Sequence, residues 1–285
     1  MEIITMPSKL NIDEDSYRFF AKLQYDIYAS KESNILLDFN PCNFIAPAFI
    51  AYLGALISLA NKWEKKLELL SEQNKAIKNY FKHSGLYDYY SGTQSKSINK
   101  NSIPFTKVQP DDDMLIEYID NILQLAPINL TDACRDSLFK NIYEIFCNAM
   151  EHSQSTCGIY TCGHWMPKRN QLIFSVCDTG IGIPRLVNQK ITNITSLEAI
   201  KWALQRGHST KQLTNGVPRG LGMADLKDFT KLNQGSLIVF SNDIYYNCSA
   251  DETIINLPYD IIGTLITVVI IADYKHIYYL KEEYS

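Results

Sequence analysis

Residues 131–153 predict one long helix whose two sides differ in chemistry. Thr131 and Asp132 are residue types that cap a helix N-terminus. Apolar residues then recur every three or four positions, a spacing that gathers them on one side of the helix and favours packing of that side on a sheet. They are Leu138, Ile142, Ile145, Phe146 and Ala149.

Another side of this helix carries polar residues at the same kind of spacing. Steps of three and four residues bring them into one stripe, which consists of Glu144, Asn148, Glu151 and His152. Such a stripe is also typical of a helix face that is simply exposed to water. It therefore indicates a functional site only where an independent signal points the same way.

The first independent signal is the stretch VCDTGIGIP, residues 176–184. Asp178 ends an apolar strand there, and Gly180 and Gly182 follow it at alternate positions. Such glycines allow a tight turn and a close approach of the backbone to a ligand. The carboxylate at the strand end can accept hydrogen bonds from an amino group of that ligand.

The second signal is the stretch GVPRGLGMADL, residues 216–226, in which Gly220 and Gly222 stand immediately before an apolar helix. Backbone N–H groups at a glycine-rich helix start, together with the helix dipole, form an anion or phosphate site. The sequence contains no G-x-x-x-x-G-K-[ST] pattern, so the other common nucleotide cradle is absent. Glycine pairs at turns are common, so each pair alone is a weak signal. The order and spacing of all three features together indicate a ligand site.

Strand-like stretches flank these motifs. They lie at residues 103–108, 170–178, 236–242 and 264–273, while residues 111–113 supply an acidic helix start and residues 195–230 read as helix followed by loop. Strands toward the end of the chain and helices in the middle predict a layered α/β domain with helices on one face of a sheet.

The three motifs together resemble the GHKL (Bergerat-fold) ATPase family. The resemblance rests on Glu-x-x-x-Asn-Ala on a helix, Asp-x-Gly-x-Gly-Ile after a strand and Arg-Gly-Leu-Gly before a helix, and spans about residues 130–270. It is greatest to the ATPase domains of anti-sigma-factor kinases and histidine kinases. Gly263 and Thr264 complete it, because family members usually carry Gly-Thr before their last strand. The resemblance implies a two-layer α/β sandwich, a mixed sheet with helices on one face, and ATP and Mg²⁺ as cofactors.

The resemblance also implies a role for each residue at the centre of the site. Asn148 would hold the Mg²⁺ that bridges the triphosphate, a cation that favours such sparse protein ligation. Glu144 would orient and deprotonate the attacking water or hydroxyl group. Asp178 would accept the adenine amino group, with Thr264 as its support.

Further residues would surround the nucleotide. Gly180, Gly182 and Ile183 would admit the base and the ribose, and the N–H groups of Gly220, Leu221 and Gly222 would cradle phosphates. Residues 188–219 would form the ATP lid, helical up to Gly207 and then loop. Three lid residues have an open role, as phosphate contacts or as ordinary solvated side chains: Ser209, Thr210 and Arg219.

The N-terminal third resembles the STAS domains of anti-anti-sigma factors, less specifically. Residues 34–39 read as a strand ending in Asp, and residues 47–70 read as a long helix. The polar stretch 91–102 separates a STAS-like interaction domain, residues 1–98, from the ATP-binding domain, residues 99–285. STAS regulators usually present a phosphorylatable Ser or Thr before this helix, but here the residues are Ala46, Pro47 and Ala48. We therefore expect an interaction or dimerisation platform, or a generic α/β core.

Composition limits the classes of partner. The net charge is −4 and no block of Lys and Arg occurs, so nucleic-acid binding has no support. The uncharged run 44–61 is near the length of a membrane span, but it contains Pro47 and Gly54, and a buried helix is favoured. Seven scattered cysteines and the lack of a signal-peptide pattern predict a cytoplasmic protein with reduced thiols.

Several functions stay open on the sequence alone. The first is a Mg²⁺-dependent ATP-binding regulator, of bacterial or phage signalling, that hydrolyses ATP or uses it to switch a protein partner or homodimer contact. The second is an anti-sigma-like Ser/Thr kinase with Glu144 as base. A histidine kinase ranks last, because only His83 precedes the ATPase region and its surroundings lack the expected acidic neighbour. A catalytically silent ATP sensor is the non-enzymatic alternative.

Overall fold

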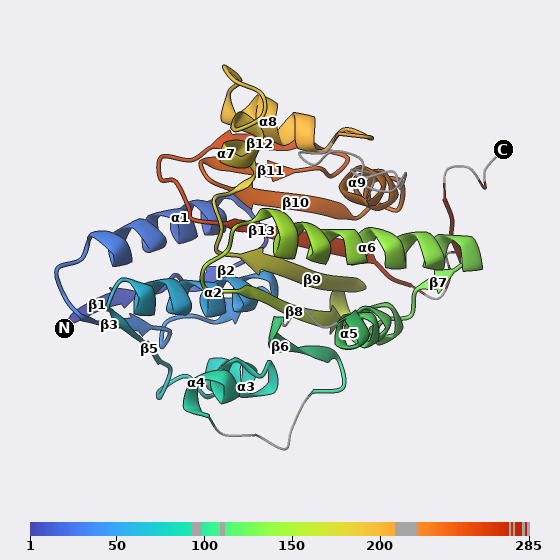
Figure 1. Ribbon diagram of the computed structural model, residues 1–285. Helices are drawn as coiled ribbons and strands as arrows, with labels where there is room; N and C mark the ends of the chain where they lie inside the picture. Colours follow the sequence, from blue (N-terminus) through green and yellow to red (C-terminus); the bar gives the residue numbers. More distant parts are fainter. Residues whose placement is uncertain are drawn as a thin grey trace.

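A seven-stranded antiparallel sheet forms the centre of the computed structural model, which describes residues 1–92, 99–108, 112–208, 222–273, 275, 277–280 and 283 (Figure 1). Within these residues the strands follow the spatial order β12 (Thr253–Asn256), β11 (Ile244–Asn247), β10 (Ser236–Ser241), β13 (Thr264–Ile271), β9 (Gln171–Asp178), β8 (Ile159–Met166) and β6 (Ser102–Val108).

The four predicted strands are confirmed, but the expectation of a mixed sheet is wrong. Every pair of neighbours in the seven-stranded sheet is antiparallel. Strands β8 and β9, and likewise β10 and β11, follow one another through short turns, which permit only antiparallel pairing. The sequence analysis did not predict β8, β11 or β12.

One face of this sheet is covered by α5 (Asp112–Leu125), α6 (Asp132–His152) and α9 (Gly222–Leu232). Thr131 caps α6, since its hydroxyl accepts the N–H of Cys134 at 3.2 Å. Figure 1 shows α6 lying along the strands. The apolar side predicted for this helix is buried against them, as expected: Leu138, Ile142, Ile145, Phe146 and Ala149.

Short elements complete this half of the chain. Helix α7 spans Ile183–Asn188, α8 spans Ser196–Ala203, and a 3₁₀ turn, Pro167–Arg169, joins β8 to β9. Strands β7 (Asn129–Leu130) and β14 (Ile277–Tyr278) pair in parallel. The prediction that the lid is helical up to Gly207 is wrong, because α8 ends at Ala203 and Gly207 adopts a φ of +77° that breaks a helix.

The N-terminal region contains a three-stranded parallel sheet in the order β1 (Glu2–Thr5), β3 (Asn34–Asp38) and β5 (Lys66–Leu70). Helices α1 (Glu14–Ala29) and α2 (Ala48–Lys62) connect these strands. The remaining elements are β2 (Lys9–Leu10), β4 (Phe44–Ile45), α3 (Lys75–His83) and α4 (Leu86–Ser91).

The helix predicted over residues 47–70 is wrong beyond Lys62. Helix α2 ends at Lys62, Glu64 takes a φ of 60°, and the chain then enters β5. Strand β5 pairs with β3 in register, with Leu37 opposite Leu69. The charged residues between 61 and 68 hid this short strand, because they match the exposed face of a helix equally well.

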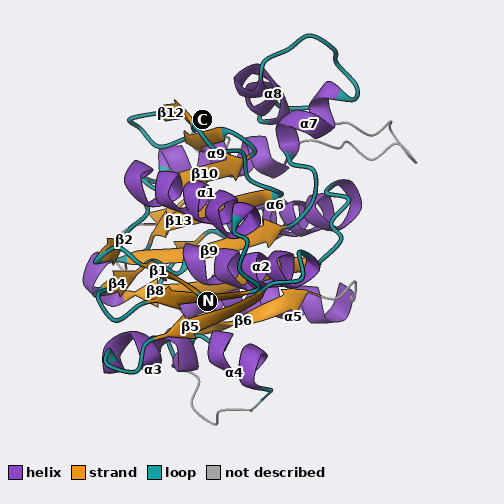
Figure 2. Cartoon of the chain, turned by 90° about the vertical axis from the view of Figure 1, so that its left-hand side faces the viewer, coloured by secondary structure: helices purple, strands orange, loops and turns teal. Residues whose placement is uncertain are grey.

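Helices α1 and α2 cover the second face of the central sheet (Figure 2). The Tyr17 hydroxyl in α1 donates to Thr267 Oγ1 of β13 at 3.2 Å, and the Ser175 hydroxyl of β9 donates to the carbonyl of Ala48 at 3.4 Å. The sequence analysis did not predict this second layer of helices. The described apolar core continues between the two regions, and the division into residues 1–98 and 99–285 stays a prediction, with residues 93–98 outside the described part.

The uncharged run 44–61 forms the buried helix that was favoured over a membrane span. Most of α2 is fully buried inside the protein. Across the described residues, no helix has both the length and the apolar character needed to cross a membrane.

Candidate functional site

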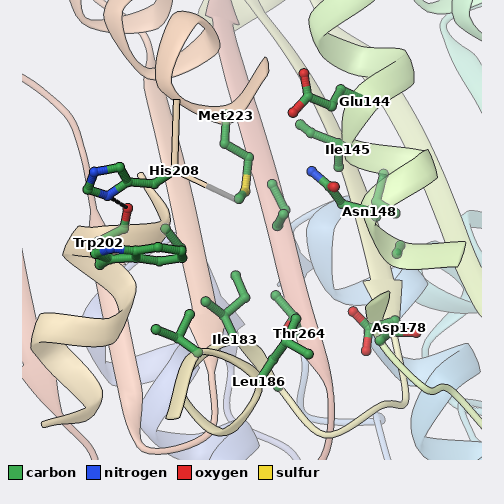
Figure 3. Close-up of a pocket in the computed structure, with 17 residues that line it drawn as sticks. Glu144, Ile145, Asn148, Asp178, Ile183, Leu186, Trp202, His208, Met223 and Thr264 are labelled. Atoms are coloured by element: carbon green, nitrogen blue, oxygen red, sulfur yellow. Dashed lines mark hydrogen bonds between the residues drawn. The ribbon is translucent and has the colours of Figure 1, made fainter. Parts of the chain in front are cut away.

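A pocket opens at one end of the central sheet, between α6, α7, α8 and the start of α9 (Figure 3). It encloses about 830 Å³, which includes some space open to solvent. Six of the residues predicted from sequence line it: Glu144, Asn148, Asp178, Gly182, Ile183 and Thr264. Residues far apart in the chain, from Glu144 to Thr264, thus meet in one cavity.

Not all predicted site residues can be placed. Ser209, Thr210, Arg219, Gly220 and Leu221 lie outside the described residues, as does the side chain of His152. The lid predicted over 188–219 is therefore described only to residue 208.

Asp178 is the last residue of β9 and is almost completely buried. Burial raises the pKa of its carboxyl group to about 7, although backbone hydrogen bonds from Gly180 and at Thr264 lower the pKa in part. The N–H of Gly180 donates to Asp178 Oδ1 at 2.8 Å. This leaves a buried acceptor at the floor of the pocket, held in one orientation.

The two glycines after Asp178 are required by packing within the protein itself. A side chain at Gly180 would overlap the carbonyl of Ser153, which accepts the N–H of Ile181 at 2.9 Å. Gly182 has a φ of +85°, and a side chain there would overlap the amide of Asn242. The close approach to a ligand that was predicted for these glycines stays a prediction.

Ser241, at the end of β10, is a site residue that the sequence analysis missed. Its hydroxyl oxygen accepts the N–H of Ile183 at 2.9 Å and lies 2.8 Å from Thr264 Oγ1. It therefore joins the first residue of α7 to the first residue of β13. No motif marks this serine, because its role depends on the register of β10 against β13, which sets Ser241 opposite Thr264.

Glu144 and Asn148 project from α6 on the same side of the pocket (Figure 3). Glu144 Oε2 accepts the N–H of Gly222, the first residue of α9, at 2.8 Å. A Cβ atom on Gly222 would lie 2.7 Å from Glu144 Cβ, so only glycine allows this approach. The predicted carboxylate and the predicted anion-binding helix start are thus in direct contact.

The last described part of the lid region is joined to the first turns of α9. Arg206, beyond α8, forms an ion pair of 2.7 Å with Asp225 in the first turn of α9. The Lys227 ammonium group donates to the carbonyl of Leu204 at 3.4 Å. These contacts hold the end of α8 and the start of α9 together.

Trp202 and His208 form the wall of the pocket opposite α6, and the sequence analysis missed both (Figure 3). Their rings stack with centroids 4.8 Å apart. His208 Nδ1 lies 3.1 Å from the Trp202 carbonyl oxygen, which can only accept, so Nδ1 carries the hydrogen. The spacing of Trp202 and His208 in the sequence does not mark them as pocket residues, because an ordinary helix end could carry the same pair.

The donor set of the pocket fits Mg²⁺ only when the ligand supplies further oxygens. No group of three His, Cys, Asp or Glu side chains able to hold a metal occurs in the described part of the chain. The side-chain amide of Asn148 and the carboxylate of Glu144 nevertheless lie at the pocket. Mg²⁺ is commonly held by one or two protein ligands together with substrate phosphates and water, so the residues present suit a phosphate-bound Mg²⁺.

No protein-family model matches the sequence, and a search of curated proteins finds no match either. The functional assignment therefore depends on the residues and their geometry.

Proposed function

We propose that this protein binds ATP together with Mg²⁺ in this pocket and uses ATP binding or hydrolysis to switch a contact with a partner. The observation that carries the proposal is the meeting of Glu144, Asn148 and Asp178 in one pocket with an otherwise largely apolar lining.

The base of the nucleotide would lie at the Asp178 end. A carboxylate oxygen there would accept the adenine amino group, and the apolar side chains of Ile183 and Leu186 would contact the faces of the ring. Ser241 and Thr264 would keep this end of the pocket in shape through their hydrogen bonds. An acceptor at this position favours adenine, whose exocyclic group donates, over guanine, whose corresponding group accepts.

The phosphates would lie between α6 and the start of α9. Asn148 would hold Mg²⁺, which would neutralise phosphate charge and orient the terminal phosphate. The N–H groups at the α9 start would bind phosphate oxygens, helped by the helix dipole. Glu144 would accept a proton from the attacking water, or from a partner hydroxyl in the kinase alternative.

The N-terminal stretch that stands where STAS regulators carry a phosphorylatable residue would lie away from the nucleotide. Ala46 and Ala48 are buried against the second face of the central sheet, where the carbonyl of Ala48 bonds to Ser175. The pocket is lined instead by Val176, the next residue of β9. Successive residues of a strand point to opposite faces, so the sheet separates the two places. This stretch of the chain would therefore not present a residue to a nucleotide bound in the pocket.

The test is incubation of the protein with Mg²⁺ and ATP labelled on its terminal phosphate, beside Glu144→Ala and Asn148→Ala. Release of labelled phosphate that both variants lose supports the ATPase switch. Acid-stable label on Ser or Thr of a protein supports the kinase. Binding of ATP without either product supports the silent sensor. Absence of ATP binding by calorimetry, with GTP as the matched comparison, would overturn the proposal.

A further inference from the structure

The N-terminus of α9 already has an anionic partner in this structure. The N–H of Gly222 donates to the carboxylate of Glu144 at 2.8 Å. On the function proposed above, on which this inference rests, the same N–H belongs to the group that binds phosphate. A side chain of the protein therefore occupies a place that a phosphate oxygen would take.

Packing keeps the two partners close. Gly222 is buried, and a Cβ atom on it would come within 2.9 Å of three atoms of Glu144. Helix α9 is anchored beneath this point by Leu226 and Phe229, which are buried in the same apolar cluster as Ile145 of α6. The core thus anchors both helices, and rotation of the Glu144 side chain is the smallest change that would free the Gly222 N–H for a phosphate.

The described lining of the pocket offers no permanently positive side chain to offset a phosphate, and its basic residue His208 lies on the wall opposite α6. It contains Glu144 and Asp178 but no Lys or Arg among the residues that the structure describes. A metal-free triphosphate would have to displace the Glu144 carboxylate from Gly222 and then remain beside it. Like charges at such short range in a partly buried site repel strongly.

We propose that Glu144 makes phosphate binding conditional on a divalent cation, so that the site admits the cation-bound nucleotide and discriminates against the free one. The cation would sit between the phosphates and the side chains of α6, with Asn148 as its protein ligand, and would remove the repulsion. Glu144 would then be a specificity residue that selects the cation-bound nucleotide over the free one, before any chemical step.

The experiment compares Glu144→Gln with the wild-type protein and with Glu151→Gln. Glutamine keeps the size and the hydrogen-bonding oxygen of Glu144 but removes its charge. Glu151 is an exposed carboxylate two turns further along the same helix, so Glu151→Gln is a matched loss of charge. Dissociation constants for ATP and for adenosine are measured by calorimetry, once with Mg²⁺ and once with excess EDTA.

Glu144→Gln is expected to tighten ATP binding about tenfold in EDTA but less than about threefold in Mg²⁺, because the cation already screens the carboxylate. Adenosine, which has no phosphate, should bind all three proteins equally in both buffers, which also shows that the variants are folded. In the nucleotide-free protein, hydrogen exchange of the Gly222 amide should become faster in Glu144→Gln and stay unchanged in Glu151→Gln.

The outcomes separate this inference from the proposed function. Equal tightening in both buffers, no tightening, or the same effect in Glu151→Gln would overturn the role of Glu144 while ATP binding stands. If the wild-type protein binds neither ATP nor adenosine in Mg²⁺, the proposed function fails and this inference fails with it.

Discussion

The hydroxyl groups of Ser241 and Thr264 lie 2.8 Å apart across strands β10 and β13, and the Ser241 oxygen also accepts the N–H of Ile183. This one side chain therefore ties the first turn of α7 to the end of the sheet. Ile183 and Thr264 both line the pocket, whereas Ser241 stands behind them. The shape of the site thus depends on a residue outside its lining.

Ser241→Ala is expected to loosen the Asp178 end of the pocket. The variant leaves the N–H of Ile183 without its acceptor in a partly buried turn, which costs about 1–3 kcal/mol of unfolding free energy. ATP affinity should fall about fivefold as Ile183 loses its fixed position. Urea unfolding and calorimetry measure the two effects. Ser236→Ala, at the other end of the same strand, is the control, and an equal loss of affinity in it would contradict this role.

Asp178→Asn is expected to stabilise the empty protein at pH 8. The pKa of Asp178 is about 7 in the folded protein and close to 3.8 when unfolded, so the folded state holds the extra proton between these values. The unfolding free energy contributed by this group therefore decreases as pH rises from about 4 to 7 and is constant above. Removing the buried charge should raise the free energy of unfolding at pH 8 by up to about 4 kcal/mol, which urea unfolding measures.

The same variant should lose nucleotide binding. In Asp178→Asn the amide oxygen can still accept the N–H of Gly180, so its NH₂ group faces the pocket and opposes the adenine amino group. We expect at least a tenfold loss of ATP affinity together with the gain in stability. Wild-type affinity should rise with pH through about 7, as the carboxylate ionises. A variant that is both less stable and equally tight in binding would contradict this assignment of Asp178.

Periodicity predicted the parts of the fold and site that depend on local sequence. The polar stripe of α6, the acceptor at the end of β9 and the glycine at the start of α9 each follow from spacing within about ten residues. Their meeting at one site did not follow from spacing and came from the resemblance. The mixed sheet implied by that resemblance was wrong, because strand direction is set by connections that spacing does not reveal.

The second layer of helices had a signal that was not used. Strand β13 reads TLITVVII and is buried along nearly its whole length, without the alternation expected of a sheet exposed on one face. A strand of this kind predicts cover on both faces. Ser241 and the stacked pair of Trp202 and His208 had no such signal, because their roles arise from contacts between distant segments.

Trp202→Ala is expected to lower ATP affinity about fivefold to thirtyfold, since it removes a large aromatic wall and the ring on which His208 stacks. The protein has three tryptophans, and Trp202 is the one that lines the described pocket. In Trp202→Phe, binding measured by calorimetry should be nearly retained while the fluorescence change on adding Mg²⁺ and ATP is lost. Trp63→Phe should keep that change, and its loss there instead would place the nucleotide elsewhere.

The effect of Gly54→Ala on stability tests how α2 packs against the central sheet, because close packing and loose packing predict opposite signs. In an ordinary helix interior, Gly to Ala stabilises by about 1 kcal/mol. Here a Cβ atom at Gly54 would overlap the ring of Phe105, which is buried in β6 beside α2. We therefore expect the free energy of unfolding, measured in urea, to fall by about 1–3 kcal/mol, as for other overpacked cores.

The control is the same substitution in a Phe105→Leu background. There Gly54→Ala should cost less than in the wild-type protein, because the smaller side chain leaves room for the methyl group. A gain in stability from Gly54→Ala in the wild-type background would mean that α2 does not press on Phe105 and that the second helical layer is held less closely.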